Sequence, residues 1–205
     1  MKKKVLGTNV LLALLVFIYG CDKIALSPIE VVQWVENPVN GLKVEQRKEN
    51  FRFQVQYKPL DYIVAMEERK HSLLKATVEA RKQELGDHLD YFSFKISPAT
   101  QGKDVWAYVQ QAENPQVKSD LTYYLSYEMK KDFYLLDGKD TLGCSLYQFV
   151  NTSGISPDLD FVMAFEKRPE KDRLLVYDDK VFGLGPVQLK VKKESINHIP
   201  TLKTQ

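Results

Sequence analysis

The chain has little cysteine and histidine, and this scarcity limits its chemistry. Its 205 residues include two cysteines and three histidines, which favours neither a disulfide scaffold nor a histidine-rich metal centre. It also lacks the Gly-x-Ser-x-Gly turn of serine hydrolases, the phosphate-binding loop that ends in Gly-Lys-Ser/Thr, and the His-Glu-x-x-His zinc signature. Gly183-Leu184-Gly185 carries only part of a dinucleotide fingerprint. The sequence therefore indicates no enzyme class, no metal and no cofactor.

Excess charge of one sign is also missing. The formal net charge is +2, and residues 1–20 hold three lysines and no acid, so the remaining chain has 26 basic against 27 acidic residues, about −1. A near-neutral chain has no electrostatic footprint for nucleic acid. The pairs Lys130-Lys131 and Lys192-Lys193 are expected to be solvated ends of strands. We therefore expect no nucleic-acid partner.

The amino-terminal residues have the pattern of an export signal. A cationic head, Met1–Lys4, precedes the apolar run Val10–Ile18, which is shorter than the ~20 residues of a membrane-spanning helix. The run stops at Tyr19-Gly20-Cys21, as in a secretory signal with a small residue before the cleavage site. We therefore expect residues 1–20 to be removed.

The run Ile18-Tyr19-Gly20-Cys21 resembles the lipobox of bacterial lipoproteins, although Tyr19 is larger than the residue usual at that position. The resemblance implies cleavage before Cys21 and attachment of fatty-acyl chains such as palmitate to it. Two acyl chains are enough for stable membrane attachment. The alternatives are an ordinary secreted protein with a cysteine near its new terminus and a plain inner-membrane anchor.

Three further segments extend the resemblance to uncharacterised lipoproteins of Bacteroidetes type: Gln33–Pro38, Gln56–Tyr62 and Gly183–Leu189. It implies an envelope lipoprotein and transfers no active-site residue. The expected organisation is a signal peptide at 1–20, a lipidated tether at 21–27 and a single α+β domain at 28–205. Because only one acid follows Cys21 within residues 22–26, we expect the outer membrane, with the domain facing the periplasm.

Strict alternation of apolar and polar residues predicts half-buried strands. Phe51–Lys58 alternates without a fault and is expected to pair antiparallel with Leu42–Arg47. The other expected strands are Phe92–Ser97, Asp132–Leu136, Thr141–Val150, Leu159–Phe165, Arg173–Tyr177 and Val187–Lys192. The later strands suggest a meander, and their alternation disfavours the continuous apolar strands of a parallel sheet.

Helices are expected at three places. Ser27-Pro28 with Glu30 forms a capping box for a short helix that ends at Asn37-Pro38. Pro59–Leu85 reads as one long helix closed by Gly86, and Asn114-Pro115 starts another. The expected fold class is α+β, mainly an antiparallel sheet or sandwich with one long helix (about 59–85) and one or two shorter helices.

Candidate chemical groups are few, and each has a plain structural alternative. Cys144 is expected to be a small buried hydrophobe, and a nucleophile only if a base or helix terminus activates it. Glu68 and His71 have the Glu-x-x-His spacing of a metal ligand pair but no further acidic helices. Acids at the predicted turns either bind an ion or, more often, hydrogen-bond their own backbone; they are Asp137, Asp140, Asp158, Asp160, Asp178 and Asp179.

Three functional hypotheses follow. The first is a non-enzymatic binding or assembly module held at a membrane by Cys21, with a protein partner. The second is a binder of small molecules or glycans, for which Tyr123, Tyr124 and Tyr127 supply an aromatic cluster with at least one outward ring. The third is a hydrolase in which polar residues from distant strands meet in one cleft.

Overall fold

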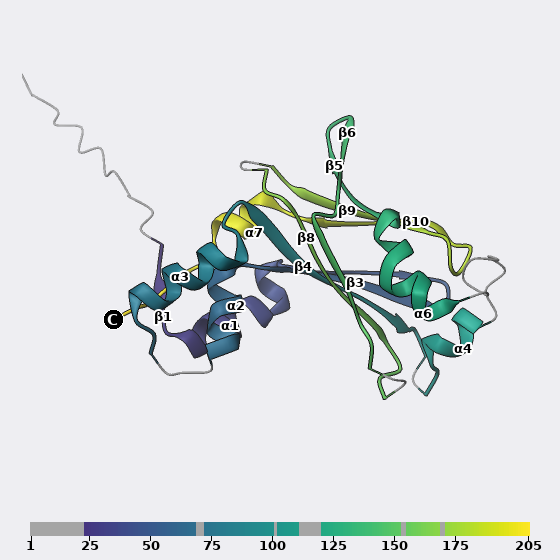
Figure 1. Cartoon of the computed structure of the whole chain (residues 1–205), viewed down its shortest axis with the longest axis horizontal. Helices are drawn as coiled ribbons and strands as arrows, with labels where there is room; N and C mark the ends of the chain where they lie inside the picture. Colours follow the sequence, from purple (N-terminus) through teal and green to yellow (C-terminus); the bar gives the residue numbers. More distant parts are fainter. Residues whose placement is uncertain (1–22, 69–71, 101, 111–119, 153–154, 169–170) are drawn as a thin grey trace, which may run out of the picture.

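The computed structural model describes residues 23–68, 72–100, 102–110, 120–152, 155–168 and 171–205. Two antiparallel sheets pack face to face, with helices at both ends of the long axis (Figure 1). The first sheet has the order β2-β3-β4-β8-β7 and the second the order β10-β9-β5-β6. The expected combination of helices with mainly antiparallel sheets is confirmed.

The strands of the first sheet are β2 (Lys43–Lys48), β3 (Phe51–Lys58), β4 (Leu89–Pro98), β7 (Leu146–Val150) and β8 (Leu159–Glu166). Those of the second are β5 (Phe133–Asp137), β6 (Asp140–Gly143), β9 (Arg173–Asp179) and β10 (Gly185–Val191). A separate parallel pair joins β1 (Ala25–Leu26) to β11 (Thr201–Leu202). Hairpins join β2 to β3, β5 to β6, β7 to β8 and β9 to β10. β3 pairs with β4 across two intervening helices, β4 pairs with β8, and β5 pairs with β9, so the sheets are not a simple meander.

The helical elements form two groups (Figure 1). Near β1 and the carboxyl terminus lie α1 (Pro28–Glu36), α2 (Leu60–Glu68) and α3 (Lys75–Leu85). Near the opposite end lie α4 (Val105–Gln110) and α6 (Leu121–Tyr123). The remaining helical elements are the 3₁₀ turn η1 (Pro38–Asn40), the π-helical turn η2 (Tyr124–Glu128), the 3₁₀ turn η3 (Met129–Asp132) and α7 (Lys193–Asn197).

Aromatic rings fill the space between the two sheets. The alternation of β3 and β4 puts Phe53 and Phe94 on the inner face, and both contact Tyr177 of β9, at ring-centroid distances of 6.1 and 5.6 Å. Phe133 of β5 lies 5.0 Å from Phe94 and 5.8 Å from Phe161 of β8. Tilted and edge-to-face pairs of this kind stabilise beyond their buried area. The inner face is therefore a closed aromatic core.

The predicted start of α1 is confirmed. The backbone N–H and the hydroxyl of Ser27 both donate to Glu30, at 2.9 and 2.7 Å, and Pro28 occupies the first turn. These bonds partner groups that a helix terminus otherwise leaves free. Trp34 is half-buried and packs against the core, which docks α1 on the sandwich.

The prediction of a single long helix at 59–85 is wrong. The chain forms α2 and α3 instead, and Leu74 just before α3 is extended. Leu73 is 2% exposed, and its carbonyl accepts from the N–H of Gln205, while Lys75 donates its N–H to the Gln205 carbonyl. Backbone pairing with the carboxyl terminus therefore replaces the helical bonds that would have joined α2 to α3.

Two other expectations need correction or fall outside the structure. The expected strand Thr141–Val150 is divided between the sheets, because the chain crosses from β6 to β7 and Ser145 donates its N–H to Ala164 of β8. The helix start at Asn114-Pro115 lies outside the described residues. The chain that follows is α6, η2 and η3, in which Tyr124 and Leu125 are buried.

Candidate functional site

A groove runs between α2, α3 and the outer face of the five-stranded sheet. We call it the outer groove. It has a volume of about 360 Å³, within the range of small-molecule sites. Its lining comes from α2 (Tyr62, Ile63, Met66, Glu67), α3 (Leu85) and the sheet (Lys58, Tyr91, Leu146, Gln148, Val162). Alternation creates the sheet wall, since the residues between the inward aromatic positions face outward.

The walls of the outer groove are mainly apolar even where tyrosines contribute. The hydroxyl of Tyr62 donates to Glu36 Oε1 at 3.2 Å, and that of Tyr91 donates to the carbonyl of Leu85. Burial first, and then Glu36, raises the pKa of Tyr62 to about 12. Both hydroxyls are neutral and satisfied, so the tyrosine rings join Ile63 and Val162 as apolar surface.

The polar side chains of this lining are Gln148, Glu67 and Lys58, and the Glu67 carboxylate pairs with Arg81 at 2.7 Å. Lys58 carries the other charge. It is half-buried at the end of β3, and among the described residues no carboxylate lies within ion-pair distance of it. Burial lowers the pKa of its ammonium group, and the more distant charges of Asp160 and Glu36 offset part of this effect. These acids are engaged elsewhere, Asp160 with Lys95 at 3.2 Å and Glu36 with Tyr62. A partly desolvated cation without a partner is costly and offers a site for an anion.

A second pocket, which we call the lysine pocket, has a volume of about 320 Å³. Its charged lining is Lys23, Lys58, Lys82, Lys167 and Asp61, and Lys58 is shared with the outer groove. Lys82 pairs with Asp61 Oδ1 at 2.5 Å, and Lys167 donates to the carbonyl of Asp87 at 3.3 Å. Lysines therefore outnumber acids around it.

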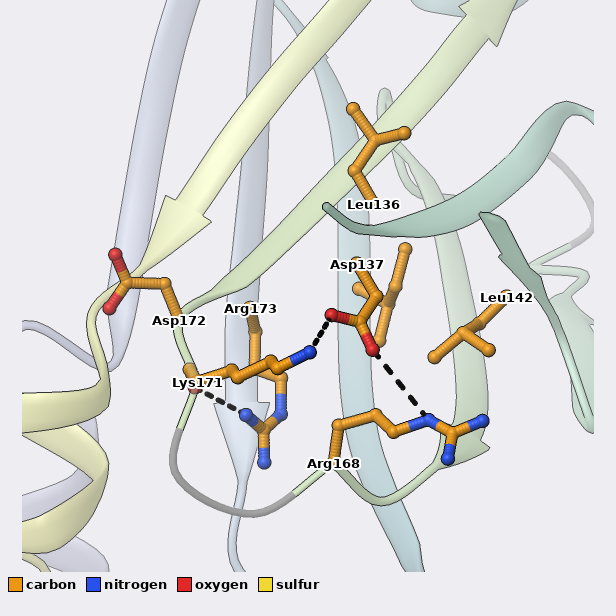
Figure 2. A pocket seen from close by; sticks show the side chains of 8 residues that line it. Leu136, Asp137, Leu142, Arg168, Lys171, Asp172 and Arg173 are labelled. Atoms are coloured by element: carbon orange, nitrogen blue, oxygen red, sulfur yellow. Dashed lines mark hydrogen bonds and ion pairs between the residues drawn. The ribbon is translucent and has the colours of Figure 1, made fainter. Parts of the chain in front are cut away.

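A third pocket lies beside β5 and β9 and is drawn in Figure 2. Asp137 points between Lys171, with which it forms an ion pair, and Arg168, whose Nε lies 3.9 Å away. The space is about 10 Å³, close to the minimum for one water molecule. Because its charges already face each other, this pocket has little capacity for a ligand.

A buried polar network links the walls of the lysine pocket and this third pocket. Arg173 Nε lies 2.5 Å from Asp90 Oδ2, and Tyr57 donates its hydroxyl to Asp90 Oδ1 at 2.8 Å. Asp90 is 0% and Arg173 5% exposed. Tyr57 lines the lysine pocket and Arg173 the third. Since Asp90 reaches neither solvent nor a cleft, the network supports the fold rather than catalysis.

The residues singled out by sequence are scattered. Burial raises the pKa of Cys144 to about 12, so its half-buried thiol is not an activated nucleophile. Cys21 and His71 lie outside the described residues, and Glu68 ends α2. In the part of the chain that the structure describes, no three His, Cys, Asp or Glu side chains gather as metal ligands.

The turn acids form separate local contacts. Asp158 and Asp160 both pair with Lys95, at 3.3 and 3.2 Å, and Asp178 pairs with Lys180. Asp140 is exposed. Asp179 accepts backbone N–H bonds from Val181, Phe182 and Leu184 at 2.7–2.9 Å. This is the backbone hydrogen bonding expected of an acid at a turn.

The tyrosine cluster is divided between surface and core. Tyr123 and Tyr127 are 53% and 66% exposed with ring centroids 5.2 Å apart, which confirms that at least one ring faces outward. Tyr124 is buried and donates its hydroxyl to Asp132 at 2.6 Å. The exposed pair lines none of the three pockets described above.

Comparisons with protein-family models, with curated proteins and with solved structures found no match to this chain. None of the helices in the described residues combines the length and apolar character of a membrane span. Sequence reasoning missed the outer groove, because the outward position of Lys58 in a strictly alternating strand indicates solvent and not a covered surface.

Proposed function

We propose that this chain is a membrane-anchored envelope lipoprotein that acts as a non-enzymatic binding module. Acylation of Cys21 would hold it at the outer membrane, facing the periplasm. The lipobox-like run Ile18–Cys21 and the preceding apolar run support the anchor.

The observation that carries the binding function is the lone cation Lys58 in the mainly apolar outer groove. An apolar ligand gains affinity from burial against Ile63, Met66 and Val162. A single acidic group on that ligand would provide the partner that Lys58 lacks among the described residues. The ligand class is therefore an amphipathic small molecule with one carboxylate or phosphate.

The hydrolase hypothesis has less support. Residues from distant strands do meet at Tyr57, Asp90 and Arg173, but Asp90 is 0% exposed. Burial, more than the neighbouring charge of Asp90, raises the pKa of Tyr57, so its hydroxyl stays protonated. Tyr57 and Arg173 line pockets, but a substrate cannot reach Asp90 itself without opening the sandwich.

The ligand test compares dodecanoate with uncharged dodecanol, which share the same alkyl chain. The protein is expected to bind dodecanoate about tenfold more tightly, the effect of one charge-assisted hydrogen bond. Lys58→Met should abolish this preference while keeping dodecanol binding, and Lys139→Met, at an exposed turn, serves as the control. Equal affinity of the unmodified protein for both probes would refute the ligand assignment.

The same measurement has a pH dependence. Since burial lowers the pKa of Lys58 below its ordinary value of 10.5, the ammonium group loses its proton at a lower pH than an exposed lysine does. The preference for dodecanoate should fall as pH rises through that pKa, and dodecanol binding should stay constant. Titration calorimetry across the alkaline range measures both.

The anchor is tested by Cys21→Ala. We expect the variant to leave the membrane fraction and to keep the far-ultraviolet circular dichroism of the native protein, because Cys21 precedes every described element. If the variant stays in the membrane fraction as fully as the native protein does, the lipoprotein assignment is refuted. In-cell crosslinking of both forms also detects an envelope protein partner, which the assembly hypothesis requires.

A further inference from the structure

The lysine pocket lies at the amino-terminal edge of the described chain. Lys23, which contributes to its lining, is two residues from Cys21. Lys167 reaches the same pocket from the end of β8, and Lys82 from α3. With Lys58 at the end of β3, residues far apart in the sequence therefore bring four ammonium groups to one pocket, and one of them is two residues from the proposed anchor.

The charges around the lysine pocket are only partly compensated. Asp61 pairs with Lys82 and also accepts the N–H of Leu202 at 3.3 Å, so this carboxylate is occupied. Lys167 contacts a neutral carbonyl, that of Asp87. Lys23 is exposed and has no carboxylate partner among the residues described. Together with Lys58, which also lines this pocket and has no carboxylate partner among the described residues, Lys23 and Lys167 leave three positive charges available to an anion.

Chain length fixes where this pocket must lie. Two residues span at most ~7 Å when fully extended. The polar headgroup region of one leaflet is roughly 5–8 Å thick, the difference between the whole bilayer and its hydrocarbon core, shared between two leaflets. With acyl chains on Cys21 in the hydrocarbon, Lys23 lies at the depth of the headgroup phosphates.

We propose that the lysine pocket binds the phosphate of an anionic phospholipid headgroup, with Lys23 and Lys167 as its donors. This inference rests on the proposed anchoring at Cys21. Leu60, Leu89 and Ile199 also line the pocket, and they match the glycerol and upper acyl carbons next to the phosphate. The contact would fix the orientation of the domain on the membrane, a property that a flexible acyl tether alone does not supply.

The test uses the full acylated protein in two kinds of vesicle, phosphatidylcholine alone and phosphatidylcholine mixed with phosphatidylglycerol. Lysine acetylation followed by mass spectrometry reports the accessibility of each ammonium group. Lys23 and Lys167 should react several-fold more slowly in the vesicles that contain phosphatidylglycerol. Lys139, in the turn between β5 and β6, should react equally in both. Equal reaction of Lys23 and Lys167 in the two vesicles would overturn the proposal.

Single variants and a free-phosphate arm sharpen this test. In Lys23→Gln the protection of Lys167 should fall about fivefold, and in Lys167→Gln that of Lys23 should fall equally, since each lysine near an anionic surface contributes about fivefold to the partition, or ~1 kcal/mol. The matched control Lys139→Gln should keep the protection of both lysines. Inorganic phosphate that protects the lysines equally in phosphatidylcholine vesicles would identify a site for free phosphate and overturn the lipid assignment.

Failure of the anchor and failure of the pocket give different results. In a flotation gradient of the same sample, a protein without acyl chains stays with the soluble fraction, which overturns both proposals. A protein that floats but whose Lys23 and Lys167 stay equally reactive retains the anchor and loses the headgroup contact. Flotation together with selective protection supports both.

Discussion

The inner and outer faces of the five-stranded sheet differ in how completely they are covered. On the inner face Phe53, Phe94 and Phe161 are at most 1% exposed, and rings of the second sheet close over them. On the outer face α2 and α3 cover one part, and Leu146 at the edge remains 40% exposed. Full burial yields the largest hydrophobic stabilisation, so the stability of the fold comes chiefly from the inner face. The outer face is available for binding.

The largest effect is expected from opening the inner face. Phe133→Ala removes a ring that contacts Phe94, Phe161 and Tyr177 and should destabilise the protein by about 4 kcal/mol. Urea unfolding followed by circular dichroism measures the change. Phe133→Leu, which leaves a smaller cavity, is the control and should cost less. If Phe133→Ala lowers the free energy of unfolding by less than ~1 kcal/mol, the core is loosely packed. The inner face would then not be the main source of stability.

A somewhat smaller effect is expected at the buried ion pair. Arg173→Met leaves Asp90 charged, buried and without its partner, which should cost about 3 kcal/mol. Adding Asp90→Asn removes that charge and keeps an acceptor for the Tyr57 hydroxyl, so the double variant should recover most of the loss. If the double variant is no more stable than the single one, the unpaired carboxylate is not the cause. Both are compared by urea midpoints.

On the outer face we expect a substitution that increases the free energy of unfolding instead of decreasing it. Lys58→Met removes a partly buried cation without a partner and should stabilise the protein by roughly 0.5–1 kcal/mol. Because the pKa of Lys58 is lower in the folded state than its ordinary 10.5, the unfolded state binds more protons between those two values. The folded protein therefore gains stability as pH rises through that window. The variant should lack this gain, and unfolding curves at neutral and alkaline pH compare the two proteins directly.

The smallest stability change is expected at the exposed edge of the groove. Leu146→Ser should change the free energy of unfolding by less than about 0.5 kcal/mol. It should nevertheless weaken dodecanoate binding about fivefold through lost apolar contact. Val150→Ser, also exposed on β7 but outside the groove lining, is the matched control. Equal weakening by both variants would place the ligand elsewhere on β7.

The strands could be predicted because their signal is local. In β3, alternation alone places Phe53 inward and Lys58 outward, and the structure agrees. The break between α2 and α3 could not be predicted. It depends on backbone bonds from Leu73 and Lys75 to Gln205, and no helical propensity within 59–85 encodes a partner at the end of the chain.

The candidate groove escaped prediction for the same physical reason. Lys58 belongs to the polar side of its strand, which sequence alone assigns to solvent. Its partial burial arises because α2 and α3 lie over that side of the sheet. The division of residues 141–150 between two sheets is likewise tertiary, since both parts have strand-forming residues and only pairing with β5 or β8 separates them.

The short parallel pair of β1 and β11 has a mechanical consequence. Thr201 and Lys203 donate their N–H groups to the carbonyls of Ile24 and Leu26, at 3.0 and 2.7 Å. Under the anchoring at Cys21 that we propose, any pull between membrane and domain would reach these two bonds before it reaches α1. Since they lie side by side along the strands, they share the load in shear instead of opening one after the other. In that case β11 would carry tension from the tether through its hydrogen bonds with β1, and the sandwich would bear less of the load.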